Sequence, residues 1–111
     1  IRDFILKTNK IYKTDSPKVL IYGAGMAGAQ LASSIDISGI YEIKGFIDDN
    51  PSLWGRNLIS KKIFPPKILD KLRNEIDQIF IAIPSLSRSR KNFLINTISK
   101  YSIPILEIPS I

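Results

Sequence analysis

The chain has 111 residues, of which 44% are hydrophobic and 23% charged, and its formal net charge is +6. This length suits one domain with a hydrophobic core of its own. The sequence contains no histidine and no cysteine, which excludes thiol nucleophiles, disulfides, histidine acid–base chemistry and zinc sites built from these residues. No apolar run approaches the roughly 20 residues that a membrane-spanning helix needs.

Residues 1–17 form a basic leader ahead of the first expected core strand. The first 18 residues carry a net charge of +3, half of the charge of the chain. Ile1, Phe4 and Ile5 share one helical face, which is typical of a juxtamembrane helix on a membrane surface and equally of a helix that docks on its own domain. Because the chain begins with isoleucine, we expect it to belong to a longer protein. No aromatic stacking platform accompanies the charge, so we expect no nucleic-acid partner.

A glycine-rich segment follows directly on an apolar run. Residues 18–22 resemble a buried parallel strand, and apolar residues recur at helical spacing from residue 27 onward. Gly23 would allow a tight turn, Gly25 would leave room for a pyrophosphate, and Gly28 would let the helix approach the strand. A helix N-terminus also offers unpaired N–H groups to a phosphate. The candidate cofactor-binding residues here are Gly23, Gly25, Met26, Ala27 and Gly28, and a purely structural turn is the alternative.

The next expected strand, residues 43–47, ends at an acidic residue. Asp48 lies 20 residues after the last of these glycines, where a carboxylate accepts hydrogen bonds from the hydroxyls of a ribose. Because a carboxylate would repel a 2′-phosphate, the sequence favours NAD over NADP, although the nearby cations of Lys44 and Arg56 leave NADP open. We include both Asp48 and Asp49 in the site and expect Asp48 to contact the ribose, since its successor would turn away. A plain polar turn is the alternative.

The remaining sequence predicts three more strands and two more helices. We expect an edge strand within residues 57–64, a helix after Pro66, a central strand over 78–83, a helix over 85–101 and a last strand over 103–108. The 85–101 helix is expected to bury one face, formed by Phe93, Leu94, Ile98 and Tyr101. Residues 18–111 would then form a three-layer α/β domain with a mostly parallel five-stranded sheet.

Polar and basic residues follow the expected central strand. Three cations, Arg88, Arg90 and Lys91, would lie in the first turn of the last helix and oppose its dipole. An anionic ligand across the carboxyl ends of the strands would offset them, and solvated surface charges are the alternative. We therefore add to the candidate cofactor-binding residues Pro84, Ser85, Ser87 and Arg88.

Three sequence blocks together resemble one protein family from about Lys18 to Ile108. They are VLIYGAG at 19–25, GFIDDNP at 45–51 and IAIPS at 81–85. They are similar to the Rossmann-like domain of membrane-anchored nucleoside-diphosphate-sugar epimerases and dehydratases of bacterial surface polysaccharide biosynthesis, including UDP-quinovosamine 4-dehydrogenases.

This resemblance implies a Rossmann-like fold that binds NAD, and leaves NADP or a UDP-sugar open as the ligand. It implies transmembrane helices before this domain and a short-chain-dehydrogenase-type catalytic domain after it in the parent protein. That protein would act at the cytoplasmic face of the inner membrane as an NAD(P)-dependent enzyme that modifies nucleotide sugars. A homo-oligomer stays open.

The residues that perform sugar chemistry in such enzymes are absent from this sequence. No tyrosine is followed by a lysine four residues later, so the Tyr-x-x-x-Lys pair that exchanges a proton with a sugar hydroxyl is missing. Whether the chain is itself an enzyme stays open, and we expect these 111 residues to bind a nucleotide without catalysis.

Two other functions stay open. The GFIDD segment at 45–49 is also similar to the N-terminal domain of bacterial sugar O- and N-acyltransferases, where it helps to bind a UDP-sugar. A left-handed β-helix would then follow in the parent protein. The other alternative is a regulatory module that senses NAD or coenzyme A. The identity of the ligand distinguishes these functions.

Overall fold

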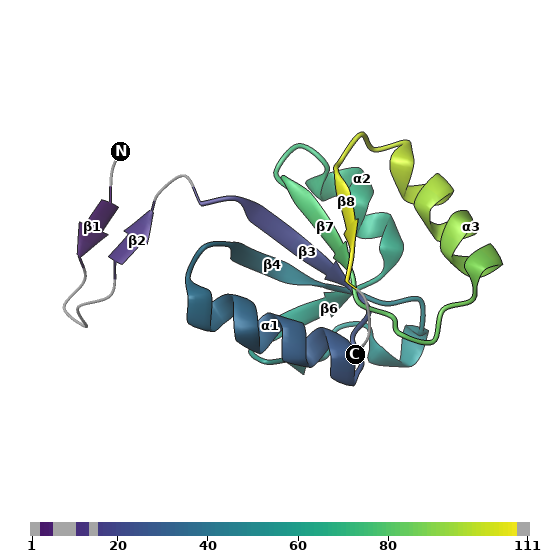
Figure 1. Ribbon diagram of the computed structural model, residues 1–111, viewed down its shortest axis with the longest axis horizontal. Helices are drawn as coiled ribbons and strands as arrows, with labels where there is room; N and C mark the ends of the chain where they lie inside the picture. The colour runs from purple at the N-terminus through teal and green to yellow at the C-terminus, as the bar shows by residue number, and fades with distance from the viewer. Residues whose placement is uncertain (1–2, 6–10, 14–15, 109–111) are drawn as a thin grey trace.

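The computed structural model describes residues 3–5, 11–13 and 16–108 (Figure 1). The main part contains, in chain order, β3 (Lys18–Tyr22), α1 (Met26–Ser38), β4 (Glu42–Ile47), η1 (Pro51–Leu53), β5 (Asn57–Leu58), β6 (Lys61–Phe64), η2 (Pro66–Ile68), α2 (Leu69–Leu72), β7 (Gln78–Ile81), α3 (Arg88–Ser99) and β8 (Ile105–Glu107). In this described part of the chain, no helix has both the length and the apolar character that crossing a membrane requires.

The leader contains two short strands where a helix was expected. β1 (Asp3–Ile5) and β2 (Ile11–Lys13) pair antiparallel, so the prediction of a leader helix is wrong for these residues. Both segments contain aromatic and β-branched residues, which favour strands, whereas the helical pattern rested on three residues. The rest of the predicted leader, residues 1–2, 6–10 and 14–15, lies outside the described residues, as do residues 109–111 of the predicted domain.

The main sheet has six strands in the order β5-β6-β4-β3-β7-β8. Five of them run parallel, as expected, and β5 is antiparallel to β6. The sixth strand arises because the segment expected to be one edge strand folds back at Ile59 and Ser60, whose φ values of 51° and 64° are left-handed and suit a two-residue hairpin turn. In the parallel part, β3 lies at the centre, with β4 on one side and β7 on the other.

Helices cover both faces of this sheet, so the domain has the three layers that the sequence predicts (Figure 1). Val19 and Ile21 of β3 belong to the core under α1, whereas Leu20 and Tyr22 belong to the core on the side of α2 and α3. All four are almost fully buried, and each such apolar side chain contributes about 1.5–3 kcal/mol. The alternation of side chains in β3 therefore connects the two cores.

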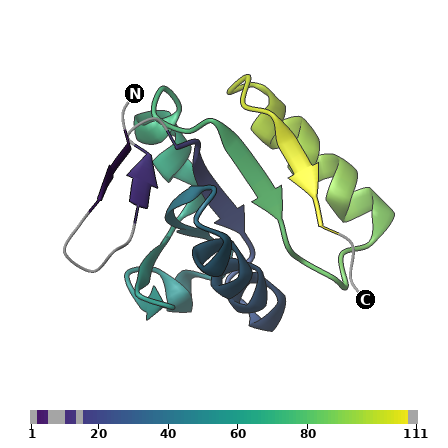
Figure 2. The same cartoon turned by 60° about the vertical axis from the view of Figure 1, so that its left-hand side comes forward.

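The last helix packs beside β7 and β8 (Figure 2). Leu94, Ile98 and Tyr101 are buried as expected, but Phe93 is 67% exposed, so its assignment to the buried face is wrong. Successive residues of a helix lie about 100° apart. Phe93 and Leu94 therefore point in different directions, and Leu94 is the one that enters the core.

Tyr101 connects α3 to α2 and gives a test of the packing. Its hydroxyl donates to Asp70 Oδ1 at 2.8 Å, and this bond, together with burial, raises the pKa of Tyr101 above its ordinary value of 10.0. The hydroxyl therefore stays protonated in the folded protein at a pH where the unfolded chain ionises, so its contribution is complete below pH 10 and is lost at higher pH.

We expect Tyr101→Phe to lower the free energy of unfolding by about 0.5–1.5 kcal/mol at pH 7 because one hydrogen bond is lost. The difference from the wild type should shrink as the pH rises through the ionisation of Tyr101. Urea unfolding of both proteins at pH 7 and at stepped alkaline pH measures this. A difference that stays constant with pH would contradict the prediction.

Candidate functional site

The turn after β3 is held by close backbone packing. The N–H of Gly23 donates to Ile47 O at 2.7 Å, and a Cβ on Gly23 would lie 2.5 Å from Ala82 O. A Cβ on Gly28 would lie 1.9 Å from Gly23 O. The packing of β4, β7 and α1 against this turn therefore requires both glycines, in agreement with two of the roles that the sequence predicts.

Gly25 lies in a different environment. Its φ of −97° and ψ of −157° are extended and open to any residue, and a Cβ there would meet no atom within 4 Å. Neither the backbone conformation nor protein packing requires a glycine here. The missing side chain keeps open the space in front of the helix that begins at this residue.

The N-terminus of α1 is suited to an anion. Gly25 is its N-cap, no side chain caps the helix, and its first turn contains no acidic residue. Gly25 and Met26 are exposed. The first N–H groups of the helix, from Met26, Ala27 and Gly28, are therefore available as donors at the positive end of the helix dipole.

β4 directs two neighbouring carboxylates to different partners. The pairing of β4 with β3 shifts by one residue just before Gly45. Beyond this bulge Phe46 belongs to the core under α1, and Ile47 belongs to the core on the opposite face. Because side chains alternate along a strand, Asp48 lies on the same face of the sheet as Phe46, and Asp49 lies on the same face as Ile47.

Asp48 is fixed beside the glycine turn. Its Oδ2 accepts the N–H of Ala24 at 2.9 Å and its Oδ1 accepts the N–H of Asn50 at 2.9 Å. The indole N–H of Trp54 donates to the backbone oxygen of Asp48 at 2.6 Å, which stabilises the following turn. Each carboxylate oxygen keeps a lone pair for another donor. The structure thus brings Asp48 to the glycine turn, and its contact with a ribose stays a prediction.

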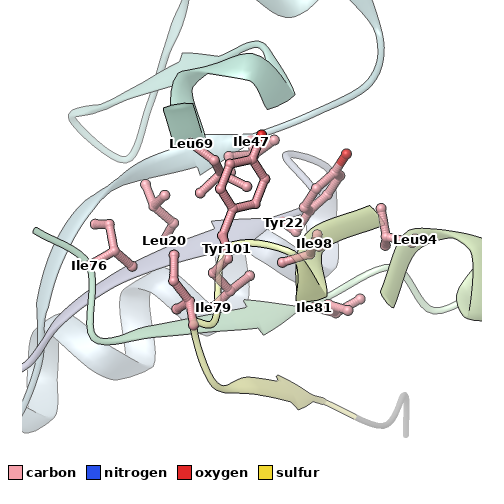
Figure 3. Close-up of a cluster of buried hydrophobic side chains, with 11 residues drawn as sticks. Leu20, Tyr22, Ile47, Leu69, Ile76, Ile79, Ile81, Leu94, Ile98 and Tyr101 are labelled. Carbon is pink, nitrogen blue, oxygen red and sulfur yellow. The ribbon is translucent and has the colours of Figure 1, made fainter. Parts of the chain in front are cut away.

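Asp49 contacts the end of β3 on the other face. The hydroxyl of Tyr22 donates to Asp49 Oδ1 at 2.5 Å. Burial, this bond and the negative charges of Asp49 and Asp48 raise the pKa of Tyr22 far above its ordinary value. The phenol is therefore protonated at neutral pH. Figure 3 shows the Tyr22 ring within the core cluster and its hydroxyl pointing away from it.

A cavity of about 140 Å³ opens beside this pair, between the carboxyl ends of the strands and α3. Its lining is mostly apolar, with four polar side chains: Pro66, Ile83, Leu86, Phe93 and Leu94 together with Tyr22, Asp49, Arg90 and Thr97. Apolar walls with a few polar groups are the usual composition of a small-molecule site. The cavity and the glycine turn lie at the same edge of the sheet, because Tyr22, the last residue of β3, lines the cavity and Gly23 begins the turn.

None of the four site residues predicted after β7 lines this cavity. Pro84 and Ser85 form an exposed turn. Ser87 is the N-cap of α3, as predicted for Ser85 or Ser87, and its Oγ accepts the N–H of Arg90 at 3.3 Å. Arg88 is exposed, and the basic residue that lines the cavity is Arg90.

Tyr22 and Arg90 are not among the site residues that the sequence predicts. A signal for Tyr22 exists, because a tyrosine as the last residue of an apolar strand places a hydroxyl at the carboxyl edge of the sheet. For Arg90 the sequence shows only a basic first turn, and the packing of α3 decides which cation faces the cavity.

The order of the parallel strands, with the glycine turn after the central strand and the acidic residue after its neighbour, defines a Rossmann-type α/β domain. The chain belongs to the family described as C2185-like, N-terminal, whose model matches residues 15–104. No curated protein sequence matches this chain.

Several solved structures are similar. UDP-D-quinovosamine 4-dehydrogenase from Vibrio fischeri is 34% identical with a TM-score of 0.81, and the match covers 86% of this chain and 80% of that chain. RSP, a Rex-family repressor, in complex with beta-NAD+ and operator DNA is 25% identical with a TM-score of 0.70, over 86% of this chain and 45% of that chain. RSP in complex with beta-NADH, 18% identical with a TM-score of 0.68 over 84% of this chain and 53% of that chain, shows the likeness of fold alone.

The different environments of the glycines give a prediction about stability. We expect Gly28→Ala to lower the free energy of unfolding by about 1–3 kcal/mol or more, because its Cβ would collide with backbone. Gly25→Ala should leave stability within about 0.5 kcal/mol of the wild type or raise it slightly. Denaturant unfolding of both variants without added nucleotide measures this. A large loss for Gly25→Ala would mean that packing requires that glycine too.

Proposed function

We propose that this domain binds NAD(H) across the carboxyl edge of its sheet. The observation that carries the proposal is Gly25, whose missing side chain leaves open the space before an uncapped helix N-terminus. The carboxylate of Asp48 lies beside the same turn. Two similar structures support the proposal. One is UDP-D-quinovosamine 4-dehydrogenase, and the other is the repressor RSP in complex with beta-NAD+.

The pyrophosphate, the adenosine ribose and the adenine base of the dinucleotide would each contact a different feature of the site. The pyrophosphate accepts hydrogen bonds from the first N–H groups of α1, where Gly25 makes room for it. The ribose hydroxyls donate to Asp48, whose carboxylate is already oriented by two backbone N–H groups. The base enters the cavity beside Tyr22, where Ile83 and Leu86 offer apolar walls.

The position of Asp48 favours NAD over NADP. Its two hydrogen bonds to backbone prevent the carboxylate from turning away, so the 2′-phosphate of NADP would lie against a fixed negative charge. The sequence left open that Lys44 could neutralise the 2′-phosphate of NADP. In the structure, Lys44 Nζ pairs with Glu42 Oε2 at 3.6 Å. This supports the choice of NAD.

In the parent protein, we propose, this domain serves an enzyme that modifies nucleotide-linked sugars for surface polysaccharides. The 34% identity to UDP-D-quinovosamine 4-dehydrogenase over most of both chains supports this role. Because the chain has neither histidine nor a Tyr-x-x-x-Lys pair, proton transfer at a sugar carbon would fall to a following catalytic domain. The same proposal includes a preceding membrane anchor, a place at the cytoplasmic face of the inner membrane, and a nucleotide sugar bound by the catalytic domain of the parent protein.

A regulatory module that senses NAD is a second candidate function. It is favoured by the 25% identity to RSP, a repressor whose structure was determined with beta-NAD+ and operator DNA. A sensor would bind NADH and NAD+ with clearly different affinities, whereas a cofactor domain of a dehydrogenase would bind both. Titration with the two forms separates these candidates.

Calorimetric titration with NAD, NADH, NADP, a UDP-sugar and coenzyme A tests the ligand. We expect NAD(H) to bind the wild type and Gly25→Val to weaken binding by at least about 100-fold, because the new side chain fills the space of the pyrophosphate. Ser34→Val, which places the same side chain at an exposed position of α1, is the control and should bind as the wild type does. If no nucleotide binds at millimolar concentration, or Gly25→Val binds normally, the turn is structural.

Asp48 gives a second test with a separate readout. Asp48→Asn should weaken NAD binding by about ten- to one-hundredfold, as expected for a lost hydrogen bond to a charged group. Asp48→Asn should also lower the ratio of NAD affinity to NADP affinity, because it removes the repulsion between the carboxylate and the 2′-phosphate of NADP. Asp49→Asn should weaken NAD binding less, and Asp36→Asn, paired with Lys61 near the far end of α1, should have no effect. An unchanged ratio of NAD to NADP affinity in Asp48→Asn would refute the role of Asp48.

A further inference from the structure

The wall of the cavity formed by Tyr22 and Asp49 presents hydrogen-bond acceptors, whereas Arg90 and Thr97 of the same lining can donate. The hydroxyl of Tyr22 gives its single proton to Asp49 Oδ1 at 2.5 Å, and the raised pKa of Tyr22 keeps that proton in place. What remains at this wall is the phenol oxygen and Asp49 Oδ2, neither of which can donate while the carboxylate is ionised.

Asp49 is held at this wall although it is exposed to solvent. Tyr22 is 3% exposed, so its ring is fixed in the core and its hydroxyl holds the carboxylate at the rim of the cavity. Arg90 lines the same cavity, and its positive charge partly offsets the influences that raise the pKa of Tyr22.

Apart from Arg90 and Thr97, the rest of the cavity lining is apolar. Ile83 and Leu86 come from the segment after β7, and Pro66 comes from the turn after β6. Such walls offer contact area to a heterocycle without distinguishing one base from another. Discrimination between bases must therefore come from the polar groups at the edge of the ring.

We propose that Asp49 selects the base of the bound nucleotide by accepting a hydrogen bond from the 6-amino group of adenine. This inference rests on the proposed binding of NAD(H). A base with an oxygen at that position, such as hypoxanthine, cannot donate there and keeps only its ring N–H as a donor at that edge, so this hydrogen bond would be lost.

The matched probes are NAD and nicotinamide hypoxanthine dinucleotide, which differ in the 6-substituent and the adjoining ring proton. We expect the wild type to bind NAD at least about tenfold more tightly than the hypoxanthine analogue, by calorimetry at neutral pH. In Asp49→Asn the amide oxygen still accepts from Tyr22, which turns the amide NH₂ toward the base. The ratio should then fall below about threefold or reverse.

Two further variants complete the test. Asp36→Asn, an exposed carboxylate-to-amide change at the other end of α1, should keep the ratio of the wild type. Tyr22→Phe removes the hydroxyl that positions Asp49 and should lower the ratio by at least about threefold. This variant tests the same wall if Asp49→Asn fails to fold.

The outcomes separate this inference from the proposed function. Tight binding of NAD with equal binding of the hypoxanthine analogue would overturn base selection and leave NAD binding intact. A wild-type ratio that persists in Asp49→Asn would overturn the role of Asp49. If the wild type binds neither dinucleotide, the proposed function and this inference both fail.

Discussion

The burial of β3 on both faces is the constraint on which the rest of the structure depends. Its side chains alternate between two cores, and β4 and β7 pair with its two edges. A central strand with no free surface must end in a turn that passes close to its neighbours, and Gly23 and Gly28 make this approach possible. Because the strands are parallel, the turn after β3, the acidic residues after β4 and the loop after β7 all meet at one edge.

The same alternation separates the two carboxylates that follow β4. Asp48 binds the backbone N–H of Ala24 in the glycine turn, whereas Asp49 binds the hydroxyl of Tyr22 beside the cavity. One residue of difference in the sequence therefore gives two different environments. A charge near an uncapped helix N-terminus suits a sugar hydroxyl, and a charge at the rim of an apolar cavity suits the edge of a base. The bulge before Gly45 sets which carboxylate faces which side.

The three glycines of the turn show how packing and ligand binding can be told apart. At Gly23 and Gly28 a side chain would collide with backbone, so these residues follow from the fold alone. At Gly25 a side chain would meet nothing in the protein. Sequence spacing treats the three alike, and the space around each residue distinguishes them.

The sequence by itself determined the elements whose signal is local. The apolar run of β3, the helical spacing of α1, the strand that ends before Asp48 and the N-cap at Ser87 appear where the sequence predicts them. Three predictions were wrong: a helix in the leader, a sheet of five strands and a buried Phe93. In each case strand pairing or side-chain packing overrides a weak local pattern.

The cavity was decided by tertiary structure alone. The Tyr22–Asp49 bond joins residues 27 apart in the chain, and the Ala24–Asp48 bond joins residues 24 apart. Arg90 reaches the cavity because α3 packs against the core through Leu94 and Ile98. Periodicity reports which side of an element is buried, and it does not report which residue of another element lies opposite. The sequence therefore determined the parallel strands of the main sheet, the glycine turn and its acidic partner, whereas the fold decided which side chains share the cavity.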